Sequence, residues 1–106
     1  MTAVTMLGRQ GAYLGFEVSG HTGAGTEGND LVCAAISFLA TTCVNALESV
    51  AGVKARARQS DAYIKVELAP GELNKEADVV LRTFHQGATD LQQAYPAFVK
   101  LIDETN

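Results

Sequence analysis

Cysteine is scarce in this sequence, with only Cys33 and Cys43 among 106 residues. Two cysteines are too few for the disulfide framework of a small secreted domain. If both lie on one helix, ten residues at about 1.5 Å each separate them by roughly 15 Å, which is beyond the span of a disulfide. We therefore expect both cysteines to stay reduced.

Long apolar runs and an excess of positive charge are also missing. No apolar run approaches the ~18 residues that a membrane span needs, and the start MTAVTMLGRQ lacks the basic and apolar segments of a signal peptide. We therefore expect a cytoplasmic protein without a membrane partner. Twelve acidic and eight basic residues give a net charge of −4, so no broad field would hold the chain on nucleic acid. A direct nucleic-acid partner is not expected.

What the chain does have is the composition of a folded domain. Hydrophobic residues make up 47% of it and charged residues 19%, which is typical of globular proteins. A chain of this length can form one core but not two. We therefore expect a single domain over residues 1–106.

The first nineteen residues are typical of a β-hairpin. Val4 and Met6 alternate with polar neighbours, and the turn sequence GRQG follows them. Leu14, Phe16 and Val18 then share one face of a second strand.

Residues 30–52 predict a helix of about six turns, because they contain no proline or internal glycine and Gly52 stands where a helix-ending residue is expected. Much of the helix surface is small or apolar, so the helix should be central and covered by its own sheet and by a second subunit. Its apolar stripe consists of Val32, Ile36, Leu39, Cys43, Leu47 and Val50.

The second half of the chain predicts another hairpin followed by a helix. Two strands are expected on either side of a turn at Ser60-Asp61, in the sequences VKARARQS and AYIKVELA. A helix is expected from about Lys75 to a point before Pro96, and AFVKLIDE predicts one or two further helical turns. The residues expected to face inward are Ile64, Val66, Leu68, Ala77, Val80, Leu81, Phe84, Ala88 and Leu91.

This element order is strand, strand, helix, strand, strand, helix. Two hairpins, each followed by a helix, suit a two-layer α+β fold. We therefore predict an antiparallel sheet of about four strands with two main helices on one face.

A glycine-rich segment, GHTGAGTEGND at residues 20–30, joins the first hairpin to the first helix. Gly23, Gly25 and Gly28 match the G-x-G-x-x-G spacing of a nucleotide-binding turn. However, no lysine follows, and the neighbouring strands are typical of hairpins rather than of a βαβ unit. A nucleotide site is therefore disfavoured, which leaves a surface loop or a mobile segment between two halves of an active site.

Asp30 and Cys33 stand at the start of the expected helix. Asp is preferred at the N-cap, where its carboxylate accepts hydrogen bonds from amides two or three residues further on. Cys33 then occupies the first turn, where unpaired amides and the helix dipole favour the thiolate over the thiol. Because the thiolate is the nucleophilic form of cysteine, Cys33 is a candidate nucleophile.

His21 is the candidate partner of Cys33, because an imidazole can take the thiol proton and later return it to a leaving amine. Eleven intervening residues span at most about 36 Å and, being rich in glycine, can fold back to a few ångströms. The spacing allows this pair but does not require it.

Other interpretations of these residues stay open. Cys33 also fits a small buried hydrophobe, as does Cys43 on the apolar stripe, and His85 is expected at the surface of the last helix. A metal site using His21, Cys33 and either Asp30 or His85 would lack paired CxxC or HxxxH spacing. We therefore expect no metal site.

The pair Gly20-His21, together with Gly28 and the run DLVCAAIS at residues 30–37, resembles the signature of the ribosomal-processing cysteine proteases. This is a bacterial family of about this length with the same element order. The resemblance implies a cysteine endopeptidase that removes the N-terminal extension of a large-subunit ribosomal protein, cutting between an aromatic and a small residue. It also implies a homodimer, and no cofactor.

The resemblance implies a role for individual residues as well. Cys33 would be the nucleophile and His21 the general base and acid, with Gly20, Asp30 and Ser37 as supporting positions. The substrate-gating loop would consist of Thr22, Gly23, Ala24, Gly25, Thr26, Glu27, Gly28 and Asn29.

Two functions without proteolysis remain as alternatives. A ribosome-associated binding module could use a basic strand face made of Lys54, Arg56, Arg58 and Lys65, although Tyr63 is the one aromatic nearby. A thiol redox sensor would use Cys33 without hydrolysing a peptide.

Overall fold

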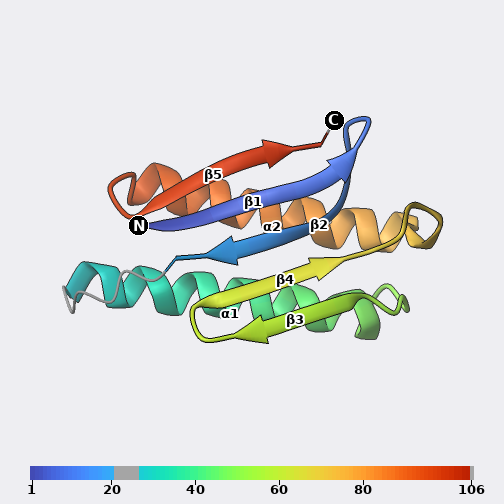
Figure 1. Ribbon diagram of the computed structural model, residues 1–106, viewed down its shortest axis with the longest axis horizontal. Coiled ribbons are helices and arrows are strands. Elements are labelled where there is room, and N and C mark those ends of the chain that lie inside the picture. The colour runs from blue at the N-terminus through green and yellow to red at the C-terminus, as the bar shows by residue number, and fades with distance from the viewer. Residues whose placement is uncertain (21–26, 106) are drawn as a thin grey trace.

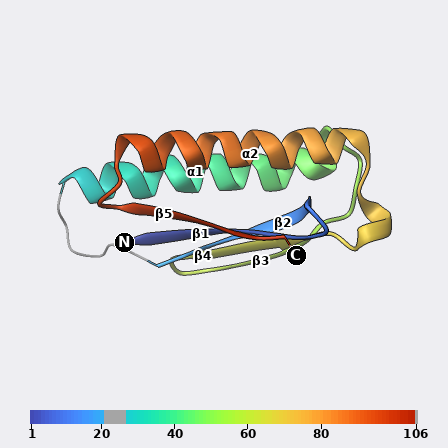
Figure 2. The same cartoon turned by 90° about the horizontal axis from the view of Figure 1, so that it is seen from above.

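The computed structural model describes residues 1–20 and 27–105, with side chains from residue 31 onward in the second range. Within these residues, two helices lie on one face of a five-stranded sheet whose strand order is β3-β4-β2-β1-β5 (Figure 1). Figure 2 shows the helices side by side as one layer and the sheet as the other. The predicted two-layer α+β fold is confirmed, and the sheet gains a fifth strand.

The first hairpin pairs β1 (Thr2–Arg9) with β2 (Ala12–Ser19) in an antiparallel register. Its two turn residues, Gln10 and Gly11, both have positive φ angles, of 53° and 83°. Such angles are what a two-residue type I′ turn requires, because its twist matches that of the flanking strands.

The second hairpin consists of β3 (Arg56–Ser60) and β4 (Tyr63–Glu67), and β4 pairs with β2 at the centre of the sheet. Its turn is at Asp61 and Ala62, one residue later than predicted, and Ala62 has a φ of 58°. A short 3-10 helix, η1 (Pro70–Glu72), then leads to the second helix.

The two helices are α1 (Glu27–Ser49) and α2 (Lys75–Ala94). α1 ends as predicted before Gly52, whose φ is 68°. The side chain of Asn74 caps α2 by accepting a 2.7 Å hydrogen bond from the backbone N–H of Ala77. Val50 is 66% exposed and does not join the buried stripe, because it follows the last turn of α1.

The core lies between the helix layer and the sheet. The rings of Phe16 on β2 and Phe84 on α2 stack with centroids 3.6 Å apart, which joins the two layers near the centre. The other large, fully buried side chains come from both layers: Met6, Ile36, Leu47, Leu68, Leu81, Val4, Val32, Val66 and Val99. The inward faces predicted for the first hairpin, for β4 and for α2 are therefore confirmed, apart from Leu91, which is only partly buried.

The C-terminal segment forms a strand, so the prediction of extra helical turns there is wrong. β5 (Val99–Glu104) runs parallel to β1 at the edge of the sheet. The N–H of Thr2 donates a 2.8 Å hydrogen bond to the carbonyl of Phe98, which begins this pairing. A short apolar segment has no strong preference of its own, and the exposed edge of β1 decides its structure.

One segment of α1, Leu31–Ser49, is long and apolar enough to cross a membrane by length and composition, although its apolar residues form no continuous run. The core helix of a folded domain passes the same test. Val32, Ile36 and Leu47 of this helix are buried against the sheet. We therefore interpret α1 as a core helix.

Gly15 offers a test of the sheet register. A Cβ atom at this position would lie 2.0 Å from the backbone oxygen of Val66 on the neighbouring strand. We expect Gly15→Ala to lower the free energy of unfolding by about 3 kcal/mol, because two central strands would have to move apart. Urea unfolding followed by circular dichroism measures this difference.

Gly71→Ala is the matched control, since a Cβ there meets nothing within 4 Å. Its expected effect is within about 0.5 kcal/mol. Equal stability of Gly15→Ala and the unsubstituted chain would contradict the pairing of β2 with β4.

Candidate active site

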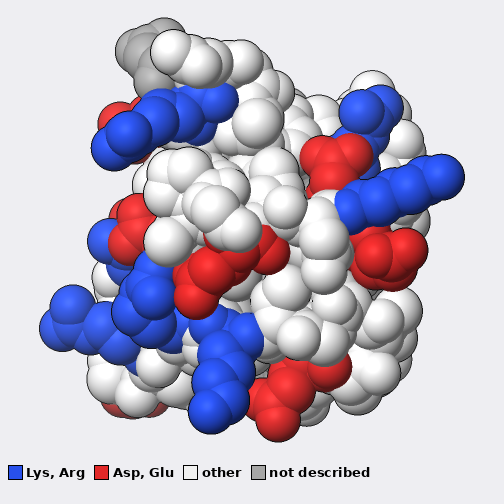
Figure 3. Space-filling model, turned by 90° about the vertical axis from the view of Figure 1, so that its right-hand side faces the viewer, with Lys and Arg blue, Asp and Glu red and all other residues white. Residues whose placement is uncertain are grey.

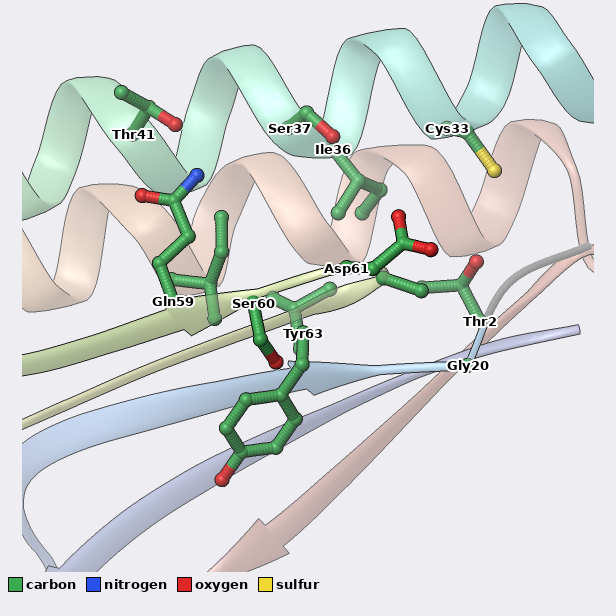
Figure 4. Close-up of a pocket in the computed structure, with 13 residues that line it drawn as sticks. Thr2, Gly20, Cys33, Ile36, Ser37, Thr41, Gln59, Ser60, Asp61 and Tyr63 are labelled. Atoms are coloured by element: carbon green, nitrogen blue, oxygen red, sulfur yellow. The ribbon is translucent and has the colours of Figure 1, made fainter.

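A cavity of about 270 Å³ lies where α1 faces the β3–β4 turn and the adjoining ends of β1 and β2 (Figure 4). Three predicted site residues, Gly20, Cys33 and Ser37, line it together. Gly20 has a φ of 92°, and a Cβ there would lie 2.7 Å from the backbone oxygen of Met1, so glycine is required at this end of β2. The fold thus brings together positions from two separate elements.

α1 presents one line of polar side chains to the cavity. Cys33, Ser37 and Thr41 are spaced four residues apart, so they share one side of the helix. Ile36, which is buried, holds that side close to the sheet. Figure 4 shows the Cys33 sulfur directed from α1 toward the sheet, on the side where Thr2 and Asp61 lie. A peptide in the cavity would therefore meet the sulfur directly.

The start of α1 differs from the prediction. The helix begins at Glu27, so Asp30 lies inside it and is not its N-cap. Cys33 is consequently in the second turn, where backbone amides are already bonded within the helix. The dipole effect falls off beyond the first turn. Activation of this thiol by the helix start alone is therefore not supported by the geometry.

Part of the predicted site lies outside the described residues. This is the case for His21 and for the loop positions Thr22, Gly23, Ala24, Gly25 and Thr26. Glu27, Gly28 and Asn29, expected in the same loop, belong instead to the first turn of α1. The described part of the predicted gating loop is therefore helical.

Cys43 lies in the core, ten residues after Cys33 on α1, as the packing interpretation predicted. Burial raises the pKa of its thiol, because the thiolate is poorly solvated there. Of the two cysteines, Cys33 is therefore the one that a substrate can reach.

The opposite wall of the cavity contains residues that sequence reasoning missed. Thr2 comes from β1, Gln59 from the end of β3, and Asp61 from the β3–β4 turn. Tyr63 also contributes, but Figure 4 shows its ring turned away from α1. The Tyr63 hydroxyl donates a 2.6 Å hydrogen bond to Glu17, which raises the pKa of Tyr63. No local motif marks any of these four positions.

Thr2 is unusual among them because its hydroxyl is buried and has no partner among the described residues. The residue is only 2% exposed, and Oγ1 makes no hydrogen bond within the described part of the chain. An unsatisfied buried hydroxyl costs about 1–3 kcal/mol. A bound molecule or an ordered water in the cavity would satisfy this hydroxyl.

Asp61 is the one charged residue among those that line the cavity in the described ranges. It forms no ion pair and no side-chain hydrogen bond with another described residue. The remaining polar lining groups, such as Ser37 and Gln59, are neutral. The described lining is therefore negative on the side of the β3–β4 turn.

His85 lies away from this cavity and is half-buried rather than at the open surface. Its ring stacks on Tyr13 with centroids 5.3 Å apart, and its Nε2 is 3.9 Å from Oδ2 of Asp103 on β5. Burial raises the pKa of Tyr13, and the charge of Asp103 raises it further. The three residues connect β5 with α2. Among the side chains of residues 1–20 and 31–105, no three His, Cys, Asp or Glu form a metal-binding group.

Comparison with protein families decides the class of this site. The family model for cysteine protease Prp matches residues 1–100. The chain belongs to the cysteine protease Prp family. It is therefore a cysteine protease, and Cys33 is the accessible cysteine of this Prp-family chain.

Solved structures agree with this assignment. SMU.848 from Streptococcus mutans is 32% identical, with a TM-score of 0.86 over 100% of this chain and 96% of the other. The essential ribosomal processing protease Prp from S. aureus in complex with a substrate peptide is 20% identical, with a TM-score of 0.88 over 98% of this chain and 100% of the other. The same protease with a covalently linked product peptide is 21% identical, with a TM-score of 0.86 and the same coverage. The two S. aureus structures show a shared fold. A search of curated proteins finds no match.

The accessibility of the two thiols can be tested by alkylation. Iodoacetamide at neutral pH should label Cys33 at least about tenfold faster than Cys43, because Cys43 is buried and its pKa is raised. In a Cys33→Ser variant, labelling of Cys43 should need a more alkaline pH than labelling of an exposed thiol does, since the raised pKa moves thiolate formation to higher pH. Intact-mass spectrometry follows both reactions.

Unfolding the protein in guanidinium chloride provides the control, in which the two thiols should react at similar rates. Equal labelling rates in the folded protein would contradict the burial of Cys43.

Proposed function

We propose that this Prp-family protease removes the N-terminal extension of a large-subunit ribosomal protein, cutting between an aromatic and a small residue. The observation that carries the proposal is the cavity in which Cys33, Ser37 and Gly20 meet. The structurally similar S. aureus protein is a ribosomal processing protease that has been solved in complex with a substrate peptide. Apolar lining from Val18, Ile36 and Ile64 suits a hydrophobic side chain of such a peptide.

The reaction is acyl transfer by Cys33 with His21 as the base. His21 takes the thiol proton, the sulfur attacks the scissile carbonyl, and a carbon–sulfur bond replaces the carbon–nitrogen bond when His21 protonates the departing amine. Water then attacks the thioester, which releases the carboxylic acid and restores the thiol. Since Cys33 lies beyond the first helical turn, His21 rather than the helix start must supply most of the activation. Gly20, Asp30 and Ser37 support this pair.

The charge pattern disfavours the alternative of a ribosome-associated RNA-binding module. Arg56 pairs with Glu72 at 3.4 Å, and on β4 Lys65 lies opposite Glu17 of β2. Acidic and basic side chains are interspersed over the end of the molecule seen in Figure 3. A mixed surface of this kind lacks the continuous positive potential that nucleic acid requires.

We also propose that the protein is a cytoplasmic homodimer that associates through the outer side of α1. Phe38 is 76% exposed, and Leu31 and Ala34 are exposed at helical spacing from it. An exposed apolar stripe on a helix is typical of an interface. Cys43 is a buried, reduced thiol, which is usual in a reducing compartment.

Cleavage of a peptide with an aromatic-aromatic-Ala-Ser junction tests the proteolytic function. Cys33→Ala and His21→Ala should each reduce kcat/KM by at least about a thousandfold, because one removes the nucleophile and the other its base. Ser37→Ala should reduce it by about tenfold, the loss of one supporting hydrogen bond. Product formation is measured by mass spectrometry.

Cys43→Ser is the matched thiol control and should retain cleavage if it folds, which circular dichroism checks. Cleavage that survives Cys33→Ala would contradict the proposed nucleophile. Rapid alkylation of Cys33 without any peptide cleavage would instead favour the redox-sensor alternative.

The proposed dimer is tested by replacing the exposed phenylalanine of α1. Phe38→Asp should convert the dimer to a monomer at micromolar concentration, because a charge would be buried at the centre of the interface. Light scattering coupled to size-exclusion chromatography measures the mass. Val79→Asp, an exposed position on α2, is the control and should remain dimeric. A monomeric unsubstituted protein would contradict the proposal.

A further inference from the structure

Among the oxygen-bearing side chains of the cavity that have no assigned role in the acyl-transfer steps, two differ from the rest in burial or charge. One is the hydroxyl of Thr2, which is buried, lines the cavity and has no hydrogen-bond partner in the described ranges. Groups of this kind are rare in folded proteins and are usually satisfied by a ligand or by ordered water. The hydroxyl can both donate and accept, so it fits a polar group of a bound peptide.

The second is the carboxylate of Asp61. Asp61 is the one charged residue among the described residues that line the cavity. No described cationic residue forms an ion pair with it. An ionised carboxylate only accepts hydrogen bonds, so its complement is an N–H group, and a positively charged one is the strongest. An acidic side chain at the same place would be repelled.

The fold brings these two groups to the same part of the cavity. Thr2 is held by β1, whose backbone is paired on one side with β2 and on the other with β5. Asp61 is held by the tight turn between β3 and β4. Figure 4 shows the oxygens of both side chains directed toward the space between the sheet and α1, near Cys33. A group bound there would lie on the side of the cavity toward which the Cys33 sulfur is directed.

We propose that Thr2 and Asp61 form a substrate-binding subsite for a Lys or Arg side chain of the peptide, close to the bond that is cut. The proposal rests on the proteolytic function proposed above and adds a charge preference to it. The Asp61 carboxylate pairs with the basic group, and the Thr2 hydroxyl accepts a hydrogen bond from the same group. Peptides with an acidic residue at that position are selected against.

A peptide series tests the charge preference. Lys, Gln or Glu is placed in turn at each of three positions on either side of the aromatic-aromatic-Ala-Ser junction, and kcat/KM is measured for each peptide. At one position, the unsubstituted enzyme should cut the Lys peptide about tenfold faster than the Glu peptide, because the exposed Asp61 carboxylate attracts the one side chain and repels the other. Asp61→Asn should reduce this ratio to about two.

Thr2→Val tests the hydroxyl, because valine keeps the shape and removes the oxygen. It should lower kcat/KM for the preferred Lys peptide about fivefold and leave the Gln peptide nearly unchanged. Its melting temperature should equal or exceed that of the unsubstituted protein, since a buried unsatisfied group is removed. A loss of cleavage with an unchanged or higher Tm separates substrate binding from a folding defect.

Each of the two variants has a matched control, one on the same strand and one with the same change of charge. Thr5→Val alters a second buried threonine of β1, and Asp90→Asn removes a negative charge from α2; neither residue lines the cavity. Both should keep the Lys-to-Glu ratio. A uniform loss on Lys, Gln and Glu peptides in Asp61→Asn would overturn the proposal, because it would place Asp61 in support of the catalytic base.

Affinity measurements keep the test independent of turnover. The Cys33→Ala protein is titrated against fluorescent Lys and Glu peptides, with and without Asp61→Asn. A Lys preference of about tenfold that disappears in the double variant supports the subsite. This result would stand even if the unsubstituted protein cut no peptide, and the lack of cleavage would then contradict only the proposed proteolytic function. Equal affinity for both peptides, or an equal preference in both proteins, would overturn the subsite.

Discussion

The burial of one side of α1 against the sheet is the constraint on which the candidate site depends. Val32, Ile36 and Leu47 are almost fully buried, so the helix can neither rotate nor slide without exposing a large apolar area. Because the rotation of α1 is set in this way, the adjacent side of the helix, with Cys33 and Ser37, must face the ends of the central strands. Core packing thus places the reactive sulfur on the side of α1 that faces the cavity.

The cavity also concentrates features that lower stability. Thr2 buries a hydroxyl without a partner in the described ranges, and Ala62 adopts a left-handed conformation next to Asp61. A non-glycine residue in that conformation costs about 1 kcal/mol. Gln10, in the turn between β1 and β2 at the opposite end, has the same kind of conformation, so backbone strain alone does not mark the site. The buried hydroxyl of Thr2 is what distinguishes the end with the cavity, since a buried polar group normally has a partner.

Much of the fold was predictable because local patterns and the global packing agree. The alternation of Leu14, Phe16 and Val18, and the position of Gly52 after the helix, depend on neighbours in the chain and were predicted correctly. The predicted start of α1 was three residues too late. Asp30 is of a residue type that often caps a helix, but in the structure it lies inside α1, which begins at Glu27. The family signature indicated the segment around Cys33. It could not indicate the opposite wall, whose residues meet it only through the order of the strands.

The same strand order explains why the missed C-terminal strand matters for the site. β1 would be an edge strand without β5, and the residues at its beginning would lose the hydrogen bond from Thr2 to Phe98. With β5 in place, the backbone of Thr2 is fixed on the β5 side, since Val99 lies directly beside it in the register. A side chain that recognises a substrate must be held within a fraction of an ångström. The parallel β1–β5 pair, which sequence patterns did not reveal, therefore gives the wall opposite Cys33 the rigidity that α1 gives the nucleophile.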